Sequence, residues 1–358
     1  MRLLTCLSTI ILFGCSSVSV SLKAQSYVPQ SDQSIVASWT VPPASEQPKV
    51  FIAQLLNDAS LPGLASRYYG RASALLKPLL AADPDDQQLK YYQATVLQYY
   101  HEFSQAQQIL NDILQRQPDN RSAWLMKANI HLVQGELAQA KSACLQLLGQ
   151  GSLVISTVCA LEVTAEQGQV AKSYQQLQSV VKMAGAMPRE QRLWMKQILA
   201  DLAYRQQLPQ QALAHLSGSV LAQAPVSFLA LWADIQLDEK QGQLVLDTLG
   251  PIVEGSDSFD DALLLRLALA EQATNPAARI WKTRLAQRIE IRLQRNDTAH
   301  AADIARYYLD IEPSPKQALF WAEINWQQAK LGPDERLLQR AMNVQYSPLK
   351  SPTVPGGT

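Results

Sequence analysis

The chain has 358 residues, which is enough for two compact domains or for one extended array of repeats. Its apolar fraction of 47% supports a continuous core, and its charged fraction of 17% is below the usual share of about 25%. The formal net charge is zero, so there is no basic excess to neutralise phosphates, and nucleic acid is not expected as a partner.

The chain begins with the pattern of an export signal. Arg2 provides a positive start, and residues 3–13 form an apolar stretch. This stretch is shorter than the roughly 20 residues that a membrane-spanning helix needs. Residues 1–14 are therefore predicted to be a signal peptide.

The end of this signal resembles the lipobox of bacterial lipoproteins. Its sequence is Leu12-Phe13-Gly14-Cys15, and Phe13 stands where the lipobox keeps a small residue. The resemblance implies a lipidated Cys15 as a membrane anchor and, through Ser16, an outer-membrane lipoprotein facing the periplasm. The alternative is an ordinary secretory signal that leaves an unlipidated periplasmic protein.

Two segments lack any helical period. Residues 15–49 are rich in Ser, Gln, Val and Pro and are predicted to form a flexible tether. Residues 347–358 contain Pro348, Pro352 and a Gly-Gly pair and are predicted to be a disordered tail.

Residues 50–346 have the pattern of helices, because strand-like alternation is absent. A first helix near residues 50–61 is cut short by Pro62 and Gly63, as in an atypical end repeat. Three sets of residues then recur at a spacing of 34: Tyr69, Phe103 and Leu137; Ala72, Ala106 and Ala140; Leu76, Leu110 and Cys144. A fixed period of this length is typical of stacked helix pairs.

The pattern resembles the tetratricopeptide repeat family. The family's Trp, small residue, turn Gly, bulky residue and Ala are matched by Trp124, Ala128, Gly135, Leu137 and Ala140. Small residues suit a close crossing of two helices, and a Gly in the turn accepts a left-handed backbone. The pattern continues in degraded form to residue 346, including a longer pair over 259–295 with its turn at Asn275-Pro276. The expected fold is all-α, a right-handed solenoid of about seven to nine antiparallel helix pairs.

The resemblance implies that the first helix of each repeat lines a concave groove. The possible groove contacts are Gln88, Tyr91, Thr95, Gln98, Tyr99, Asn129, Glu162, Glu166, Trp194, Asp201, Tyr204 and Arg205. Aromatic rings with adaptable amides suit protein or peptide recognition. Alternatively, the tyrosines pack between repeats. Trp281, Trp321 and Trp326 could anchor a partner on the convex face, although at helical spacing such residues more often belong to the core. The Lys, Arg and Asn clamp of chaperone-tail-binding members is absent.

Two cysteines remain after the signal region. Cys144 and Cys159 flank a loop centred on residues 151 and 152 at equal distances, so an antiparallel hairpin places them at the same height. They are predicted to form a disulfide or to pack as two reduced core residues.

No catalytic or metal-binding motif is present in the sequence, and the histidines are scattered over different repeats. We therefore expect no enzyme activity, no cofactor and no metal. The favoured function is an adaptor or scaffold for protein partners on the periplasmic face of the outer membrane. The alternatives are a soluble periplasmic scaffold, or a cell-wall- or polysaccharide-associated accessory enzyme with its acid/base pair among Glu162, Glu166 and Asp201.

Overall fold

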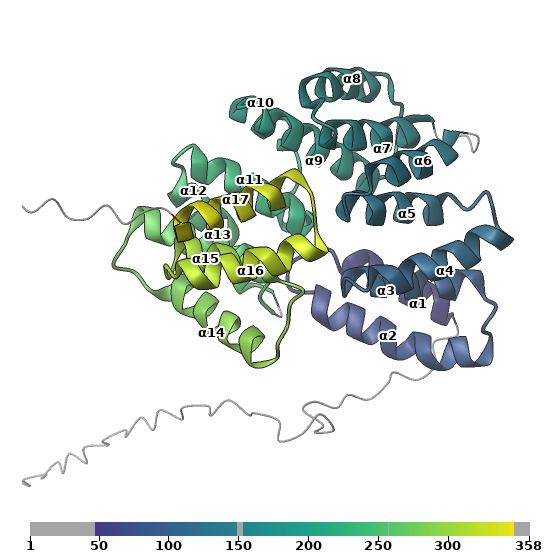
Figure 1. Ribbon diagram of the computed structural model, residues 1–358, viewed down its shortest axis with the longest axis horizontal. Helices are drawn as coiled ribbons and strands as arrows, with labels where there is room; N and C mark the ends of the chain where they lie inside the picture. The colour runs from purple at the N-terminus through teal and green to yellow at the C-terminus, as the bar shows by residue number, and fades with distance from the viewer. Residues whose placement is uncertain (1–46, 149–152, 257, 347–358) are drawn as a thin grey trace, which may run out of the picture. The chain divides into compact units, whose positions relative to one another are not determined.

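The computed structural model of the chain describes residues 47–148, 153–256 and 258–346. Within these ranges every regular element is a helix, and successive helices pack as pairs (Figure 1). This confirms the predicted all-α solenoid of helix pairs. The predicted signal peptide, Cys15, the tail and nearly all of the tether lie outside the described residues.

The first helix begins two residues before the predicted start of the solenoid. The α-helices are α1 (Pro48–Asp58), α2 (Ala65–Ala82), α3 (Gln87–Tyr99), α4 (Phe103–Arg116), α5 (Arg121–Val133), α6 (Leu137–Gln146), α7 (Leu153–Glu166), α8 (Val170–Met183), α9 (Arg189–Arg205), α10 (Pro209–Leu216), α11 (Val226–Asp238), α12 (Gly242–Glu254), α13 (Asp261–Thr274), α14 (Ile280–Gln294), α15 (Ala301–Asp310), α16 (Pro315–Gln328) and α17 (Gly332–Tyr346). None of these helices is long and apolar enough to cross a membrane.

The residues that recur every 34 positions supply the interior of the first repeats. Seven of them are buried: Ala72, Ala106, Ala140, Leu76, Leu110, Cys144 and Phe103. The alanines allow close approach of neighbouring helices, and the larger residues fill the space beside each crossing. The period in the sequence is therefore the period of the core.

Local signals set the helix ends. The side chain of Asp86 accepts hydrogen bonds from the N–H groups of Gln88 and Leu89 at the start of α3. Asn120 accepts the N–H of Ala123 at the start of α5, at 3.0 Å. These side chains satisfy backbone donors that have no partner inside the helix.

The turn inside a repeat requires a left-handed residue. Gly135 fills this position between α5 and α6 with φ +74°. His101 stands 34 residues earlier, between α3 and α4, with φ +61° although it carries a side chain. The turn thus keeps the same left-handed backbone in both repeats, although one has glycine at this position and the other histidine.

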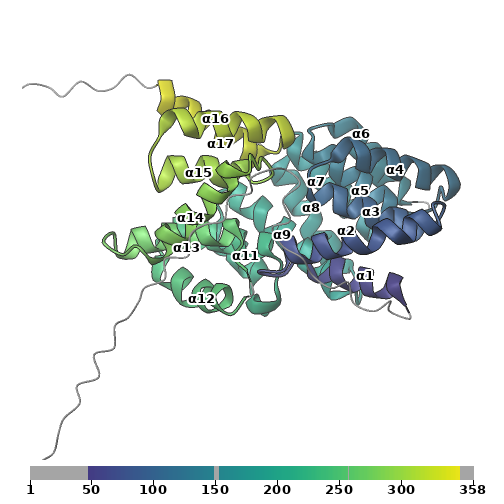
Figure 2. The ribbon, with the colours of Figure 1, turned by 90° about the horizontal axis from the view of Figure 1, so that it is seen from below.

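Segments far apart in the sequence also meet, as two hydrogen bonds show. Between α1 and α2, the N–H of Gly63 donates to Asp260 before α13, at 2.7 Å. Between α16 and α17, the N–H of Lys330 donates to the carbonyl of Val133 in α5, at 2.8 Å. The end of α16 accordingly lies beside α5 (Figures 1 and 2).

Candidate binding groove

The first helices of four successive repeats enclose a cavity of about 420 Å³. This volume lies within the range of small-ligand and peptide sites, about 300–1,000 Å³. The lining comes from α3, α5, α7 and α9: Tyr91, Thr95, Gln98, Ser122, Leu125, Met126, Ala128, Asn129, Leu132, Cys159, Glu162, Val163 and Trp194. Six predicted groove contacts are in this set, namely Tyr91, Thr95, Gln98, Asn129, Glu162 and Trp194.

The cavity offers amides that make no hydrogen bond. Asn129 is exposed, and within the described residues neither its side chain nor that of Gln98 has a hydrogen-bond partner. The hydroxyl of Thr95, by contrast, donates to the carbonyl of Tyr91 one helical turn earlier, at 3.0 Å. Free amides at apolar walls can pair with the backbone of an extended chain.

A smaller cavity of about 230 Å³ continues the groove at its second end. Five predicted contacts line it, namely Glu162, Glu166, Trp194, Asp201 and Arg205. The guanidinium of Arg205 in α9 donates to Glu166 in α7 and to Asp201, the latter at 3.4 Å. One cation is therefore shared by two carboxylates.

Glu162 has no hydrogen-bond or ion-pair partner among the described residues. Burial in the groove, with the nearby carboxylates of Asp201 and Glu166, raises the pKa of its carboxyl to about 8. Burial also raises the pKa of Asp201, against the opposing effect of Arg205. At neutral pH the Glu162 carboxyl is mostly protonated.

The segment between α16 and α17 lies against this end of the groove. Leu331 packs into the apolar cluster of α5, α6 and α7, and the N–H of Gly332 donates to Glu166 Oε2 at 3.0 Å. Pro333 lines the smaller cavity. The repeat spacing does not predict this contact, because the two residues are 166 positions apart and their segments share no pattern.

Three predicted groove contacts lie elsewhere. Tyr99, at the last turn of α3, stacks on Tyr69 with ring centroids 3.9 Å apart, in a different cavity. Tyr204 donates its hydroxyl to Asp238 at the end of α11. Gln88 is at the first turn of α3 and hydrogen-bonds Tyr92. The side chains of these three residues make contacts outside the two groove cavities, so the repeat offset alone selected too many residues.

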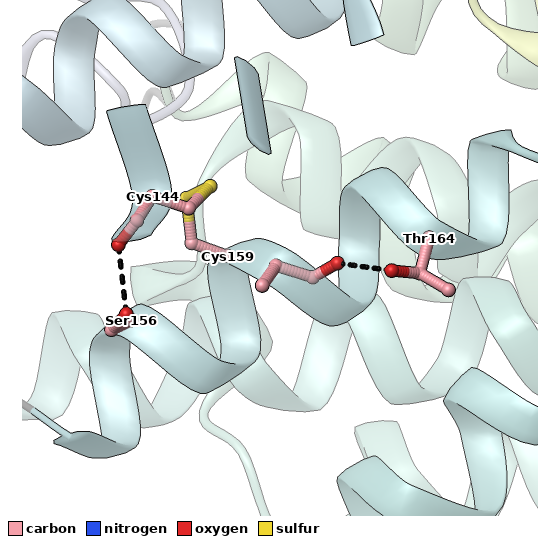
Figure 3. Close-up of a disulfide and its surroundings, with 5 residues drawn as sticks. Cys144, Ser156, Cys159 and Thr164 are labelled. Atoms are coloured by element: carbon pink, nitrogen blue, oxygen red, sulfur yellow. Dashed lines mark hydrogen bonds between the residues drawn. A yellow bond between two sulfur atoms is a disulfide. The ribbon is translucent and has the colours of Figure 1, made fainter. Parts of the chain in front are cut away.

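Cys144 and Cys159 are joined by a disulfide in the structure, with their Cα atoms 5.6 Å apart (Figure 3). The neighbouring Ser156 donates its hydroxyl to the carbonyl of Cys144 at 2.7 Å, as Figure 3 shows. Cys159 also lines the groove cavity. The bond therefore links α6 to a helix that forms the wall of the groove.

Other aromatic and ionisable residues have structural partners. Trp281 and Trp321 are buried in the largest apolar cluster, which leaves only Trp326 of the three part-exposed. His131 contacts Glu136, and the hydroxyl of Tyr174 lies 2.9 Å from His215 Nε2. In the part of the chain that the structure describes, no group of His, Cys, Asp and Glu side chains could hold a metal ion.

The tetratricopeptide repeat family model matches residues 97–151. Among solved structures, the chain is similar to one in the anaphase-promoting complex hetero-tetramer Cut9–Hcn1, at 15% identity and a TM-score of 0.49, over 84% of this chain and 57% of that one. It is also similar to a tetratricopeptide repeat protein from Parabacteroides merdae, at 15% identity and a TM-score of 0.45, over 61% and 84% of the two chains. The tetratricopeptide repeat domain of P58(IPK) matches at 13% identity and a TM-score of 0.24, over 85% and 99%.

The chain matches no curated protein sequence. The family assignment thus depends on residues 97–151, which span α4, α5 and α6 and contain the regular spacing. The helices around them pack as pairs in the way that the family's repeats do. Residues 97–151 of this chain therefore match the tetratricopeptide repeat, within an array of helix pairs that extends on both sides of them.

Proposed function

We propose that this protein is a non-enzymatic adaptor that holds an extended segment of a partner protein in the groove formed by α3, α5, α7 and α9. The tetratricopeptide repeat fold itself supports a scaffold for protein interactions. The observation that carries the proposal is the cavity of about 420 Å³, with apolar walls, the ring of Trp194 and the free amide of Asn129.

The accessory-enzyme alternative uses the same region. The structure does bring Glu162, Glu166 and Asp201 together, at the smaller cavity. However, Arg205 holds Glu166 and Asp201, which removes two of the three carboxylates from acid/base work. The geometry therefore favours binding over chemistry.

We also propose that Cys15 carries a lipid that places the adaptor at the outer membrane, facing the periplasm. The support is the lipobox-like sequence Leu12-Phe13-Gly14-Cys15. An anchored groove would search for its partner along a surface, which raises the effective concentration of the pair.

The groove is tested by photocrosslinking in intact bacteria that carry the native gene. A photoreactive residue at Asn129 faces the cavity, and one at exposed Gln108 on α4 is the matched control. We expect a partner adduct at position 129 alone. The partner, once purified, should bind the unmodified protein and lose at least about tenfold in affinity for N129R. Equal adducts at both positions, or equal affinities, would contradict the groove.

The anchor has a separate test. Metabolic labelling with palmitate should mark the full chain and leave Cys15→Ser unlabelled, and globomycin should block processing. Absence of label on the unchanged chain would support the soluble periplasmic scaffold instead.

A further inference from the structure

The groove carries one carboxyl group that the protein does not compensate. The charged groups that act on the Glu162 carboxyl are Glu166 on α7 and Asp201 and Arg205 on α9. Asp334 and Arg336 at the start of α17 act in turn on Glu166 and Asp201. With every group ionised, four carboxylates stand against two guanidiniums. Arg205 is occupied by Glu166 and Asp201, while Asp334 accepts from the side chain of Asn325.

The segment between α16 and α17 already fills one end of the groove. The backbone N–H of Gly332 reaches Glu166, and Leu331 fills the apolar cluster beside α5. This segment brings backbone amides and apolar atoms to that end, but it places no cation at Glu162. The larger cavity continues from Glu162 past Trp194, Asn129 and Tyr91.

We infer that the groove takes a partner segment with a basic side chain, arginine or lysine, set against Glu162 and flanked by apolar residues. This rests on the proposed function and names the chemistry of the partner. A guanidinium there would pair with the uncompensated carboxyl, and Trp194 lines the same cavity as a cation-accepting ring. Leu125, Met126 and Leu132 form the apolar wall for its neighbours.

Pairing with a cation also requires the Glu162 carboxyl to ionise. Without a partner segment its pKa is about 8, so about one-tenth of the molecules are ionised at pH 7. A bound arginine lowers this pKa, and a proton is released on binding. The affinity should therefore increase about tenfold between pH 7 and pH 9 and should level off above the unbound pKa.

The test begins with a random linear peptide library displayed on phage and selected at pH 9 on the full chain. Peptides that bind the unchanged chain but not the variant N129R are counted as groove binders. We expect them to share an arginine or lysine at a fixed place between apolar residues. A synthetic, fluorescently labelled arginine peptide from this set then serves as the probe.

The probe should bind Glu162→Gln at least about tenfold more weakly than the unchanged protein at pH 9, and E162Q should lose the pH dependence. Glu323→Gln is the matched control, because Glu323 is an exposed glutamate on α16 outside the groove. Its affinity and pH profile should be those of the unchanged protein. Circular dichroism of both variants confirms the helical fold.

The outcomes separate the two proposals. Groove binders without a basic residue, or an E162Q affinity equal to that of the unchanged protein, would overturn the basic-residue inference and leave the adaptor function standing. A library that yields no groove binder would count against both.

Discussion

The regular repeats, α3–α6, and the last helices, α11–α17, are held together in different ways. In the first region small and apolar residues at fixed spacing form the interior, and ion pairs such as Lys90 with Asp112 lie at the surface. In the last region charged groups lie inside. Asp261 is 2% exposed and accepts from Arg288 and Arg292 at 2.8 and 2.7 Å, and Asp234 binds both Arg266 and Arg306.

The difference explains why the repeat pattern decays along the chain. A helix crossing filled by alanine and leucine needs the same residue types in each repeat, so it leaves a period in the sequence. A crossing bridged by a carboxylate and two guanidiniums depends on single residues that need not recur in other repeats, such as Asp261 on α13 with Arg288 and Arg292 on α14. Such an ion-pair network holds the helices together but leaves no period in the sequence.

The largest expected effect breaks the buried network. Asp261→Asn leaves two guanidiniums facing a neutral amide, and we expect the free energy of unfolding to fall by about 3 kcal/mol. The matched control Asp112→Asn removes a partly exposed pair and should change the free energy of unfolding by less than about 1 kcal/mol. Urea unfolding followed by circular dichroism measures both. Equal losses of unfolding free energy in the two variants would show that ion pairs stabilise the two regions to the same extent.

The pH profile sharpens the same comparison. Burial alone would raise the pKa of the Asp261 carboxyl, but Arg288 and Arg292 together lower it below its usual value. Because the pKa of Asp261 is lower in the folded than in the unfolded protein, the ionised carboxylate contributes its full stabilisation above the unfolded pKa of about 4. That stabilisation is lost as the pH falls through the folded pKa. D261N should therefore lose stability less steeply than the unchanged protein below pH 4.

A further prediction concerns the end of the first region, where a disulfide links α6 to α7. The bond between Cys144 and Cys159 closes a loop with a sequence separation of 15, which corresponds to a stabilisation of about 3 kcal/mol at most. Protein purified without reductant should show the linked peptides in mass mapping and should unfold at lower denaturant concentration after reduction. Cys144→Ala with Cys159→Ala should match the reduced protein. Two free thiols in the unreduced protein would contradict the bond.

Much of the fold was predictable from the sequence, because contacts between neighbouring repeats follow the period. The buried positions of Ala72, Ala106 and Ala140 were set by spacing alone. The turns were predictable only where glycine marks them. Gln207 and Lys240 adopt the left-handed conformation at the turns that begin α10 and α12, and side chains of these types do not indicate it.

The groove was predictable in part for the same reason. Its walls belong to consecutive first helices, so Tyr91, Asn129 and Glu162 followed from the repeat offset. The contacts of Lys330 and Gly332 with α5 and α7 did not. They depend on the rotation that accumulates over many repeats, and no local pattern encodes that rotation.

The smallest predicted effect tests such a long-range contact. Gly63 and Gly168 both have left-handed backbones, with φ of +76° and +89°. A Cβ on Gly63 would lie 2.6 Å from both Ser256 Cβ and the carbonyl oxygen of Ser258, whereas a Cβ on Gly168 would meet nothing within 4 Å. Gly168→Ala should cost about 1 kcal/mol from backbone strain alone. Gly63→Ala should cost about 2 kcal/mol, because the clash adds to the same strain.

Hydrogen exchange locates the additional loss. In Gly63→Ala, exchange should accelerate at the start of α2 and at the start of α13, where Gly63 donates to Asp260, and should stay unchanged in α5. In Gly168→Ala, the exchange rate should not change at the start of α2 or at the start of α13. Equal destabilisation in the two variants would mean that the contact between α1–α2 and α13 adds nothing in solution.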